Sequence, residues 1–260
     1  MDTKQPKSLG KKIGTAAIAV VAALFAIFFF YTENYYHTDA DARAAMQSED
    51  SIYVSQAALG YFFDGPGSQD LLIFYPGAKV EETAYAPLLR RLAEEGTDVY
   101  LVAMPQRLAL FGKERAAEVF TEKVVDQADP TAWRQIREIY ENFYIGGHSL
   151  GGAMAARYAA EHAEQLDGLI LLAAYADQEI PDEVRLLSIY GSEDGVLNRA
   201  KYEENKANLP ENYQEVELAG GNHAQFGNYG KQRGDGAASI SAEEQQKATV
   251  DAILSFWEAE

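Results

Sequence analysis

The residues of this chain that could do chemistry gather around one serine. Ser149 stands in the sequence Gly147-His148-Ser149-Leu150-Gly151, a G-x-S-x-G pattern preceded by a strand-like run and followed by an alanine-rich, helix-forming run. Small neighbours allow a sharp turn that lifts the hydroxyl above the end of a sheet, where the free amides of the following helix point at it. This arrangement is typical of a nucleophile; the alternative is a glycine-rich turn with an inert serine.

A serine hydroxyl is a weak nucleophile unless a base takes its proton. The chain has four histidines. His37 lies next to the N-terminal apolar run, His148 is predicted to point away from the serine, and His162 lies on the helix that follows it. His223 follows a strand-like run in a loop, so we predict that it is the base. The alternative is a loop histidine bound by backbone groups.

The base needs an acid to orient it, and with this type of turn the chain order is serine, acid, histidine. Asp194 lies between the two and follows the strand-like run 184–191, so we predict that it is the acid. Glu193 next to it and Asp177, one strand earlier, remain open as alternatives. The sequence around Asp194 would also suit a solvated turn carboxylate.

Negative charge on a substrate oxygen would need two backbone amides to bind it. Leu150, directly after the serine, is predicted to supply one of them. The second should come from the loop after the apolar run 70–77, where Gly77 allows close approach of the backbone. We predict the amide of Ala78, with Lys79 as its neighbour, and a plain tight turn is the alternative.

These residues require a scaffold, and strand-like and helix-like runs alternate along most of the chain. Two short runs, 51–57 and 60–65, read as antiparallel edge strands. The alternation after them predicts a twisted, mostly parallel sheet flanked by helices, in the α/β class. The expected strands are 70–77, 97–105, 142–147, 167–175, 184–191 and 213–221, and the expected helices are 82–96, 108–127, 130–141, 150–163, 198–209 and 241–260.

The N-terminal segment has the composition of a membrane-spanning helix and is separate from the alternating strands and helices. Residues 13–32 form a run of 20 residues without charge, long enough as a helix to cross a bilayer. Four lysines precede this run, and no lysine or arginine follows it before Arg43. The positive-inside rule then predicts a single-pass cell-membrane protein with a cytoplasmic N-terminus and an extracellular main domain. A cleaved signal peptide and a buried globular helix are the alternatives.

The predicted organisation is therefore a basic cytoplasmic tail (1–12), a transmembrane anchor (13–32), a stalk or short helix (33–50) and one domain (51–260). The net charge of −18 disfavours binding to nucleic acid, which needs a basic surface. The absence of cysteine excludes a thiol nucleophile, a disulfide and a cysteine zinc site.

At these motifs the sequence resembles the α/β-hydrolase superfamily, most closely its small single-domain members related to dienelactone hydrolases. The stretches that carry the resemblance are FYPGAKVEETAYAPLLRRLAEEG, VAMPQRLALF, YIGGHSLGGAMA, YGSEDGV and GGNHAQFGNYG. The resemblance implies an α/β-hydrolase fold over residues 51–260, a Ser149–His223–Asp194 triad, and no metal or organic cofactor. Dienelactone hydrolases use a cysteine nucleophile, whereas this chain has Ser149, so their substrate is not carried over.

The sequence thus predicts a membrane-anchored serine hydrolase that cleaves a small-molecule ester through an acyl-enzyme. Two alternatives stay open: an acyltransferase with the same triad, and a catalytically silent surface module that binds a partner.

Overall fold

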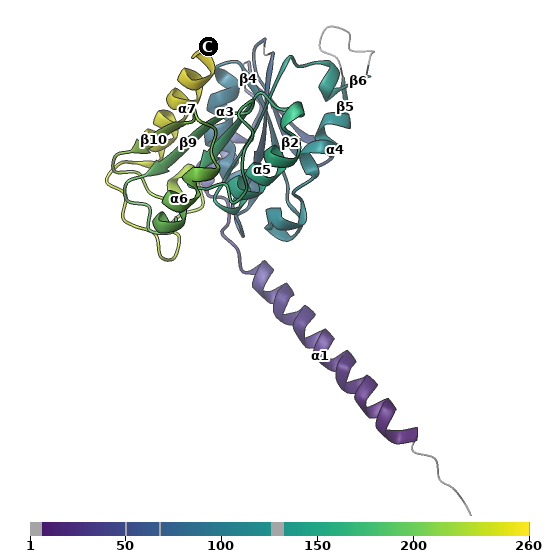
Figure 1. Cartoon of the computed structure of the whole chain (residues 1–260). Helices are drawn as coiled ribbons and strands as arrows, with labels where there is room; N and C mark the ends of the chain where they lie inside the picture. Colours follow the sequence, from purple (N-terminus) through teal and green to yellow (C-terminus); the bar gives the residue numbers. More distant parts are fainter. Residues whose placement is uncertain (1–6, 50, 68, 126–132, 260) are drawn as a thin grey trace, which may run out of the picture. The chain divides into compact units, whose positions relative to one another are not determined.

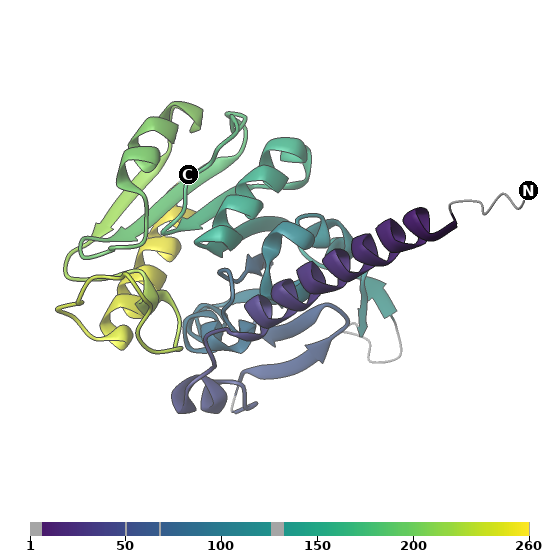
Figure 2. The same ribbon diagram turned by 90° about the horizontal axis from the view of Figure 1, so that it is seen from below.

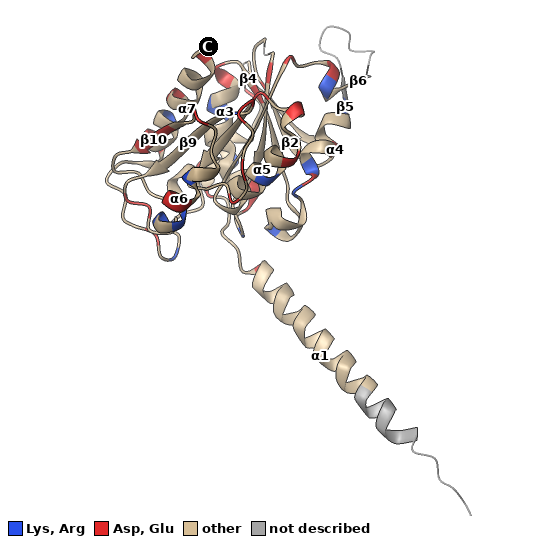
Figure 3. Cartoon of the chain, viewed as in Figure 1, with Lys and Arg blue, Asp and Glu red and all other residues tan. Residues whose placement is uncertain are grey.

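The structure is a computed structural model that describes residues 7–49, 51–67, 69–125 and 133–259 of the 260-residue chain. It divides into two compact units, Met1–Tyr35 and Tyr36–Glu260. The first unit contains one long helix, α1 (Lys7–Glu33). Within α1, the stretch Gly14–Glu33 contains an 18-residue window with a mean hydropathy of 2.3 and no buried residue, and Thr32 near the end of the stretch is buried. Figure 3 shows most of this helix without charged residues. By length and composition this helix could cross a membrane.

The second unit is built on an eight-stranded sheet in the order β1-β2-β4-β3-β7-β8-β9-β10 (Figure 1). Only the pairs β1–β2 and β2–β4 are antiparallel, and the other five pairs are parallel. The strands are β1 (Tyr53–Ala57), β2 (Gly60–Asp64), β3 (Asp70–Tyr75), β4 (Thr97–Val102), β7 (Asn142–His148), β8 (Gly168–Leu172), β9 (Arg185–Gly191) and β10 (Gln214–Leu218). The predicted mostly parallel α/β sheet is confirmed, although β2 is paired on both sides and only β1 forms that edge.

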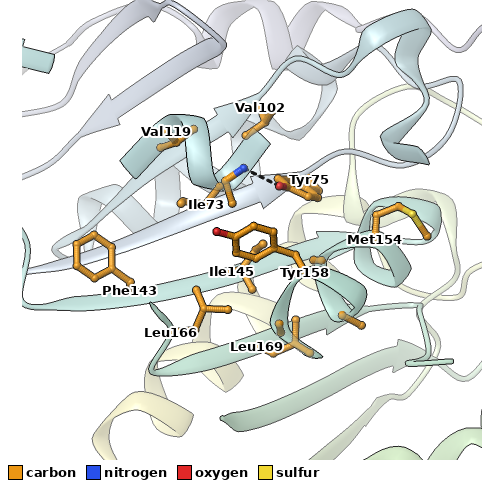
Figure 4. Packing of buried hydrophobic residues seen from close by; sticks show 14 of the residues in the cluster. Ile73, Tyr75, Val102, Val119, Phe143, Ile145, Met154, Tyr158, Leu166 and Leu169 are labelled. Atoms are coloured by element: carbon orange, nitrogen blue, oxygen red, sulfur yellow. Dashed lines mark hydrogen bonds between the residues drawn. The ribbon is translucent and has the colours of Figure 1, made fainter. Parts of the chain in front are cut away.

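Helices cover both faces of the sheet because its central strands are apolar on both sides. In β3, Leu71 and Ile73 face the side of α4 (Arg115–Thr121) and α5 (Leu150–Glu161), where Tyr158 and other buried residues pack with them (Figure 4). Leu72 and Phe74 face α3 (Ala86–Glu94) and α7 (Ala242–Glu258) on the other side. Figure 2 shows the sheet between these two layers.

The remaining helical segments are short. They are α2 (Ala40–Ala45), α6 (Arg199–Asn205) and the 3-10 turns η1 (Glu82–Tyr85), η2 (Pro105–Arg107), η3 (Ala109–Phe111), η4 (Ile136–Glu138), η5 (Ala163–Gln165), η6 (Lys206–Asn208) and η7 (Ala224–Phe226).

The two helices predicted at 108–127 and 130–141 are largely wrong. The first run holds only η3 and the seven-residue α4, and then becomes the strand β5 (Lys123–Val125). The second contains β6 (Trp133–Gln135), which pairs antiparallel with β5, followed by η4. Residues 126–132 lie outside the described part of the chain. Periodicity alone does not distinguish helix from strand in short apolar runs. Here β5 and β6 pair with each other, and this pairing makes them strands.

The segment 36–49, which the sequence analysis placed in a stalk, belongs to the second unit. Tyr36 forms a parallel bridge with Val80: its N–H donates to the carbonyl of Lys79 (2.7 Å), and its carbonyl accepts the N–H of Glu81 (2.9 Å). Asp39 then caps α2 by accepting the Ala42 N–H. Tyr36 and Thr38, whose N–H donates to the Glu81 side chain at 2.9 Å, therefore lie against the loop that follows β3, whereas the Asp39 N–H donates to Asn228 after β10.

Candidate active site

Ser149 lies at the corner between β7 and α5, in a conformation that residues other than glycine rarely adopt. Its φ is 54° and its ψ is −122°. The corner is closely packed against the end of β3, because a Cβ atom on Gly147 or Gly151 would lie 2.6 or 2.2 Å from the Tyr75 carbonyl oxygen. Such strain persists only where the surrounding structure holds it, and it is concentrated at functional sites.

The parallel pairing brings four loops to one edge of the sheet, as expected at the carboxyl ends of parallel strands. The loop after β3 carries Ala78, and the turn after β7 carries Ser149. The loops after β9 and β10 carry Asp194 and His223.

The structure brings His223 and Asp194 into direct contact. His223 Nδ1 and Asp194 Oδ2 lie 2.8 Å apart, and both residues are buried. The other carboxylate oxygen of Asp194 accepts the N–H groups of Val196 and Leu197, each at 2.8 Å. Burial acts to raise the pKa of Asp194, but the His223 side chain and these two amides outweigh it and lower that pKa below its usual value. The carboxylate therefore stays charged and can hold the imidazole in one orientation.

The second ring nitrogen of His223, Nε2, has no hydrogen-bond partner within the described part of the chain. His223 Nε2 is buried and makes no hydrogen bond to any described group, so no hydrogen bond to the Ser149 hydroxyl is formed. A buried polar atom without a partner is rare and calls for an explanation, and in unliganded sites catalytic hydrogen bonds are often not yet formed.

The other candidates from the sequence have different partners. Asp177 forms a two-bond salt bridge with Arg157, at 2.9 Å through the arginine Nε. Glu193 accepts the Ser192 hydroxyl at 3.2 Å. His162, at the end of α5, lies 3.1 Å from Glu114.

His148 lies against the proposed base, a contact that the sequence did not indicate. Its ring packs on the ring of His223, with centroids 4.4 Å apart, and it is as deeply buried as its neighbour. Burial lowers the pKa of His148 well below the usual value, and the His223 side chain lowers it further, whereas the His223 backbone carbonyl raises it. His148 is therefore neutral beside the base.

The loop after β3 presents three successive amides, two of which are engaged. Gly77 N–H donates to the Tyr85 hydroxyl at 3.0 Å, and Lys79 N–H donates to the Arg107 carbonyl at 2.8 Å. For Ala78 N–H, between them, the described residues supply no hydrogen-bond acceptor. Of the two residues that the sequence offered as donor, Ala78 is the one whose amide is available for a ligand.

Sequence reasoning missed Asp235, which joins the loops of the acid and the base. Its carboxylate accepts the N–H groups of His223 (3.2 Å), Ala224 (2.8 Å), Gly195 (3.1 Å) and Gly236 (2.9 Å). Asp235 lies in a run of turn residues, where an acidic residue is unremarkable. No signal in the sequence marks it.

One group of side chains has the spacing of metal ligands. Glu114, Glu161 and His162 place one atom each within 4.8 Å of one another at the surface. Lys113 contacts both carboxylates, at 3.0 Å for Glu114, so its charge already offsets part of theirs.

The site at the strand ends contains a serine, a histidine and a carboxylate, which are the side chains used in acyl transfer chemistry.

Comparison with known proteins agrees with this fold. A sequence model described as "Alpha/beta hydrolase family" matches residues 71–247, more than half of the chain. The chain belongs to the alpha/beta hydrolase family. The matched region of the family runs from β3 to α7 and thus includes all five residues predicted for the site.

The relatives within the family are distant. A protein of Mycobacterium phage D29 named "Putative non-heme haloperoxidase" is 28% identical over 142 residues, covering 54% of this chain and 48% of that protein. The chain thus matches about half of the length of this relative.

Among solved structures, TT1662 from Thermus thermophilus has a TM-score of 0.56 at 16% identity, covering 80% of this chain and 99% of its own. Est1E from Butyrivibrio proteoclasticus has a TM-score of 0.52 at 14% identity, covering 80% of this chain and 100% of its own. A predicted CIB-like hydrolase from Thermoplasma acidophilum has a TM-score of 0.51 at 16% identity, covering 78% and 97%. At these identities the three structures support the fold alone.

Proposed function

We propose that this alpha/beta hydrolase is a serine hydrolase that cleaves carboxylic esters through an acyl-enzyme formed on Ser149. The observation that carries the proposal is the buried His223–Asp194 pair at the same edge of the sheet as Ser149. Among the described residues, His223 Nε2 has no hydrogen-bond partner. A neutral imidazole with one nitrogen fixed by a carboxylate has its other nitrogen free to accept a proton.

The reaction follows from these positions. Rotation of the Ser149 side chain brings Oγ to His223 Nε2, which takes its proton as the oxygen attacks the acyl carbon. The positive imidazolium is stabilised by the Asp194 carboxylate, and it then gives the proton to the departing alcohol as the ester bond breaks. Water repeats the sequence: it loses a proton to Nε2, attacks the acyl-enzyme and releases the acid, and Ser149 recovers its hydrogen.

The negative oxygen of each tetrahedral intermediate needs donors. We assign the amides of Ala78 and Leu150, because Ala78 N–H lacks an acceptor among the described residues and Leu150 is the first residue of α5. The first amides of a helix have no partner within the helix and carry partial positive charge. Each donor of this kind contributes about 3 kcal/mol to the rate when it is aimed at the oxyanion.

The proposal includes a membrane location. The uncharged stretch of α1 has the length of a bilayer crossing, and lysines precede it, so we propose a cytoplasmic N-terminus and an extracellular hydrolase unit. Labelling intact cells with a membrane-impermeant lysine reagent should modify the second unit and spare Lys4 and Lys7. Protection of the second unit would contradict this orientation.

The catalytic proposal is tested with a fluorophosphonate probe, which reacts with activated serines. The full-length chain in a non-ionic detergent should be labelled and should hydrolyse p-nitrophenyl acetate. Ser149→Ala should abolish the labelling and lower kcat by about five orders of magnitude. Ser55→Ala is the matched control, because Ser55 lies in the edge strand β1 and not in one of the loops that carry the proposed site. Equal labelling of Ser149→Ala and the wild type would sink the proposal.

A further inference from the structure

Behind the base lies a buried chain of contacts that the reaction above does not use. The His148 ring packs on the His223 ring, and on the far side His148 Nδ1 lies 2.8 Å from the Tyr85 hydroxyl. That hydroxyl also accepts the Gly77 N–H, one residue before Ala78. The contacts therefore run without interruption from the proposed base to the loop of the proposed oxyanion donor.

We propose that His148 and Tyr85 are positioning residues that fix the oxyanion loop relative to the base. This inference rests on the proposed function. Each residue acts through a neighbour, Tyr85 through the Gly77 peptide and His148 through the His223 ring. Tyr85, from η1, holds the peptide that precedes the Ala78 amide, and His148, from the end of β7, supports the face of the His223 ring.

The hydrogen bonds of Tyr85 determine which ring nitrogen of His148 carries the proton. The Tyr85 oxygen already accepts one N–H, and among the described residues the only acceptor near its own hydrogen is His148 Nδ1. Tyr85 therefore donates to Nδ1, which places the proton of the neutral His148 on Nε2. In this tautomer the His148 Nε2–H is buried, and the described residues supply no hydrogen-bond acceptor for it.

Glycine at position 77 makes this close approach feasible. A Cβ atom there would lie 2.8 Å from His148 Nδ1 and 2.8 Å from the Tyr85 oxygen, so any larger residue would push the loop away from the pair. Tyr85 and His148 cannot move away instead, because both are almost fully buried and pack against Phe74 and Phe226 respectively. The contact thus depends on matched residues from three separate parts of the chain.

Loss of the Tyr85 hydroxyl should affect the transition state more than substrate binding. An oxyanion donor acts mainly on the tetrahedral intermediate, so a small displacement of Ala78 lowers kcat and leaves KM nearly unchanged. We expect Tyr85→Phe to lower kcat for p-nitrophenyl acetate by about 10-fold to 100-fold, with KM within about threefold of wild type. His148→Phe keeps an aromatic ring against His223 but loses the bond to Tyr85, and should show the same pattern.

The matched control is Tyr100→Phe. The Tyr100 hydroxyl also accepts a backbone N–H, that of Leu59 at 3.0 Å, and the residue is equally buried, but it lies in β4 and its hydroxyl donates to Glu122 instead of to a residue of the proposed site. This variant should lose stability without losing kcat.

The decisive measurement is a double-mutant cycle in the full-length chain in detergent, with kcat expressed per site labelled by the fluorophosphonate probe. If His148 and Tyr85 act as one unit, the double variant should be no more than about threefold slower than the slower single variant. Normalising to labelled sites removes losses that come from unfolded protein. Wild-type kcat per labelled site in both single variants, or multiplicative losses in the double variant, would overturn the proposal.

The two proposals fail separately. If Ser149→Ala keeps its activity, the proposed function is wrong whatever the activities of the Tyr85 and His148 variants are. If Ser149→Ala is inactive while Tyr85→Phe and His148→Phe retain wild-type kcat, only the positioning role is wrong.

Discussion

Two loops at the site are held by different forces. The elbow, residues 146–153, is fixed by backbone contacts, because Gly147 and Gly151 lie directly on the Tyr75 carbonyl. The base loop, residues 219–241, is fixed by side chains that bind backbone groups far away in the sequence. Asp235 reaches Gly195, and Gln245 exchanges hydrogen bonds with the Asn222 backbone, at 2.9 and 2.8 Å.

The difference shows two ways to place a catalytic group. Close packing of glycines allows only one backbone geometry, and the glycines themselves can be recognised in a short stretch of sequence. A network of polar contacts specifies a geometry only after the whole domain has folded, and each of its members looks ordinary by itself. If this difference holds, one substitution in the elbow should abolish folding and activity, whereas single substitutions in the base loop should cause partial losses of both.

The largest effect is expected in the elbow. In Gly151→Ala the new methyl group would lie 2.2 Å from the Tyr75 carbonyl oxygen and 2.4 Å from that of Pro76, and backbone cannot move aside easily. We expect the free energy of unfolding to fall by more than about 3 kcal/mol and probe labelling to be lost. Urea unfolding of the full chain in detergent, followed by tryptophan fluorescence, measures it.

Gly168→Ala in β8 is the control for this substitution. Its nearest contacts would be 3.0 Å to the Tyr144 ring and 3.1 Å to the Arg185 carbonyl, so smaller shifts suffice, and a loss of about 1 kcal/mol is expected. Equal losses at both glycines would remove the steric account of the elbow.

A buried carboxylate outside the base loop, that of Asp98, should lower the stability of the fold at neutral pH. Asp98 accepts the Gly65 N–H (2.8 Å) and the Tyr140 hydroxyl (2.5 Å). Burial raises the pKa of Asp98 from 3.8 to about 6, in spite of these bonds. Between these values the folded state binds more protons than the unfolded state, so stability conferred by this group is present at pH 4 and is lost as the pH rises through 6.

Asp98→Asn should therefore gain stability relative to wild type between pH 4 and pH 7, by an amount on the order of 3 kcal/mol for the shift of about two pKa units. Urea unfolding of both proteins at several pH values measures it. Parallel stability curves for the two proteins would contradict the raised pKa. Asp194 has the opposite shift, so its contribution is present above pH 3.8 and is lost as the pH falls through its lowered pKa.

The third prediction concerns the base loop itself. Asp235→Asn exchanges one acceptor oxygen for an NH₂ group that would face backbone N–H donors, since the carboxylate accepts four of them. We expect a loss of about 2 kcal/mol in stability and about 10-fold in kcat, because the His223 and Gly195 backbones lose a common anchor. Asp251→Asn, whose carboxylate meets Lys247 on the surface of α7, should change neither by much. If Asp235→Asn does not fold at all, the base loop is as sensitive to a single substitution as the elbow.

The same contrast explains what could be predicted from the sequence. Alternating apolar runs gave the order of most strands and helices, and the glycines around Ser149 indicated the turn. The hairpin β5–β6 was missed because its three-residue strands follow a helix-like run and depend on each other for pairing. Those strands have no signal of their own.

The residues that organise the site were the hardest to foresee. Asp194 and His223 could be proposed from chain order, because this type of turn constrains where they must come from. Tyr85 and Asp235 could not, since Tyr85 meets His148 across 63 positions and Asp235 meets Gly195 across 40. The contact of His148 with His223 was not foreseen, because the sequence shows that His148 precedes the serine but not that its ring lies against a residue 75 positions later.

The smallest effect is expected where the N-terminal segment joins the base loop. The Tyr36 hydroxyl accepts the Arg233 N–H at 3.1 Å, and its ring packs on Tyr229 with centroids 5.5 Å apart. Because Tyr36 also bridges to Val80, this one residue connects the base loop to the loop of Ala78. Tyr36→Phe keeps the ring and the bridge and removes only the acceptor.

Loss of one partly exposed hydrogen bond predicts a change below about 1 kcal/mol in stability and at most a few-fold decrease in kcat. Tyr36→Ala also removes the ring contact and should cost more than Tyr36→Phe in both quantities, whereas Tyr53→Ala, at an exposed position on the edge strand β1, should not affect kcat. If the base loop is held by many small polar contacts, the losses from Tyr36→Phe and Asp235→Asn should add in the double variant, since the two side chains share no hydrogen-bond partner. A double variant that loses all activity would show that the base loop, like the elbow, fails as a single unit.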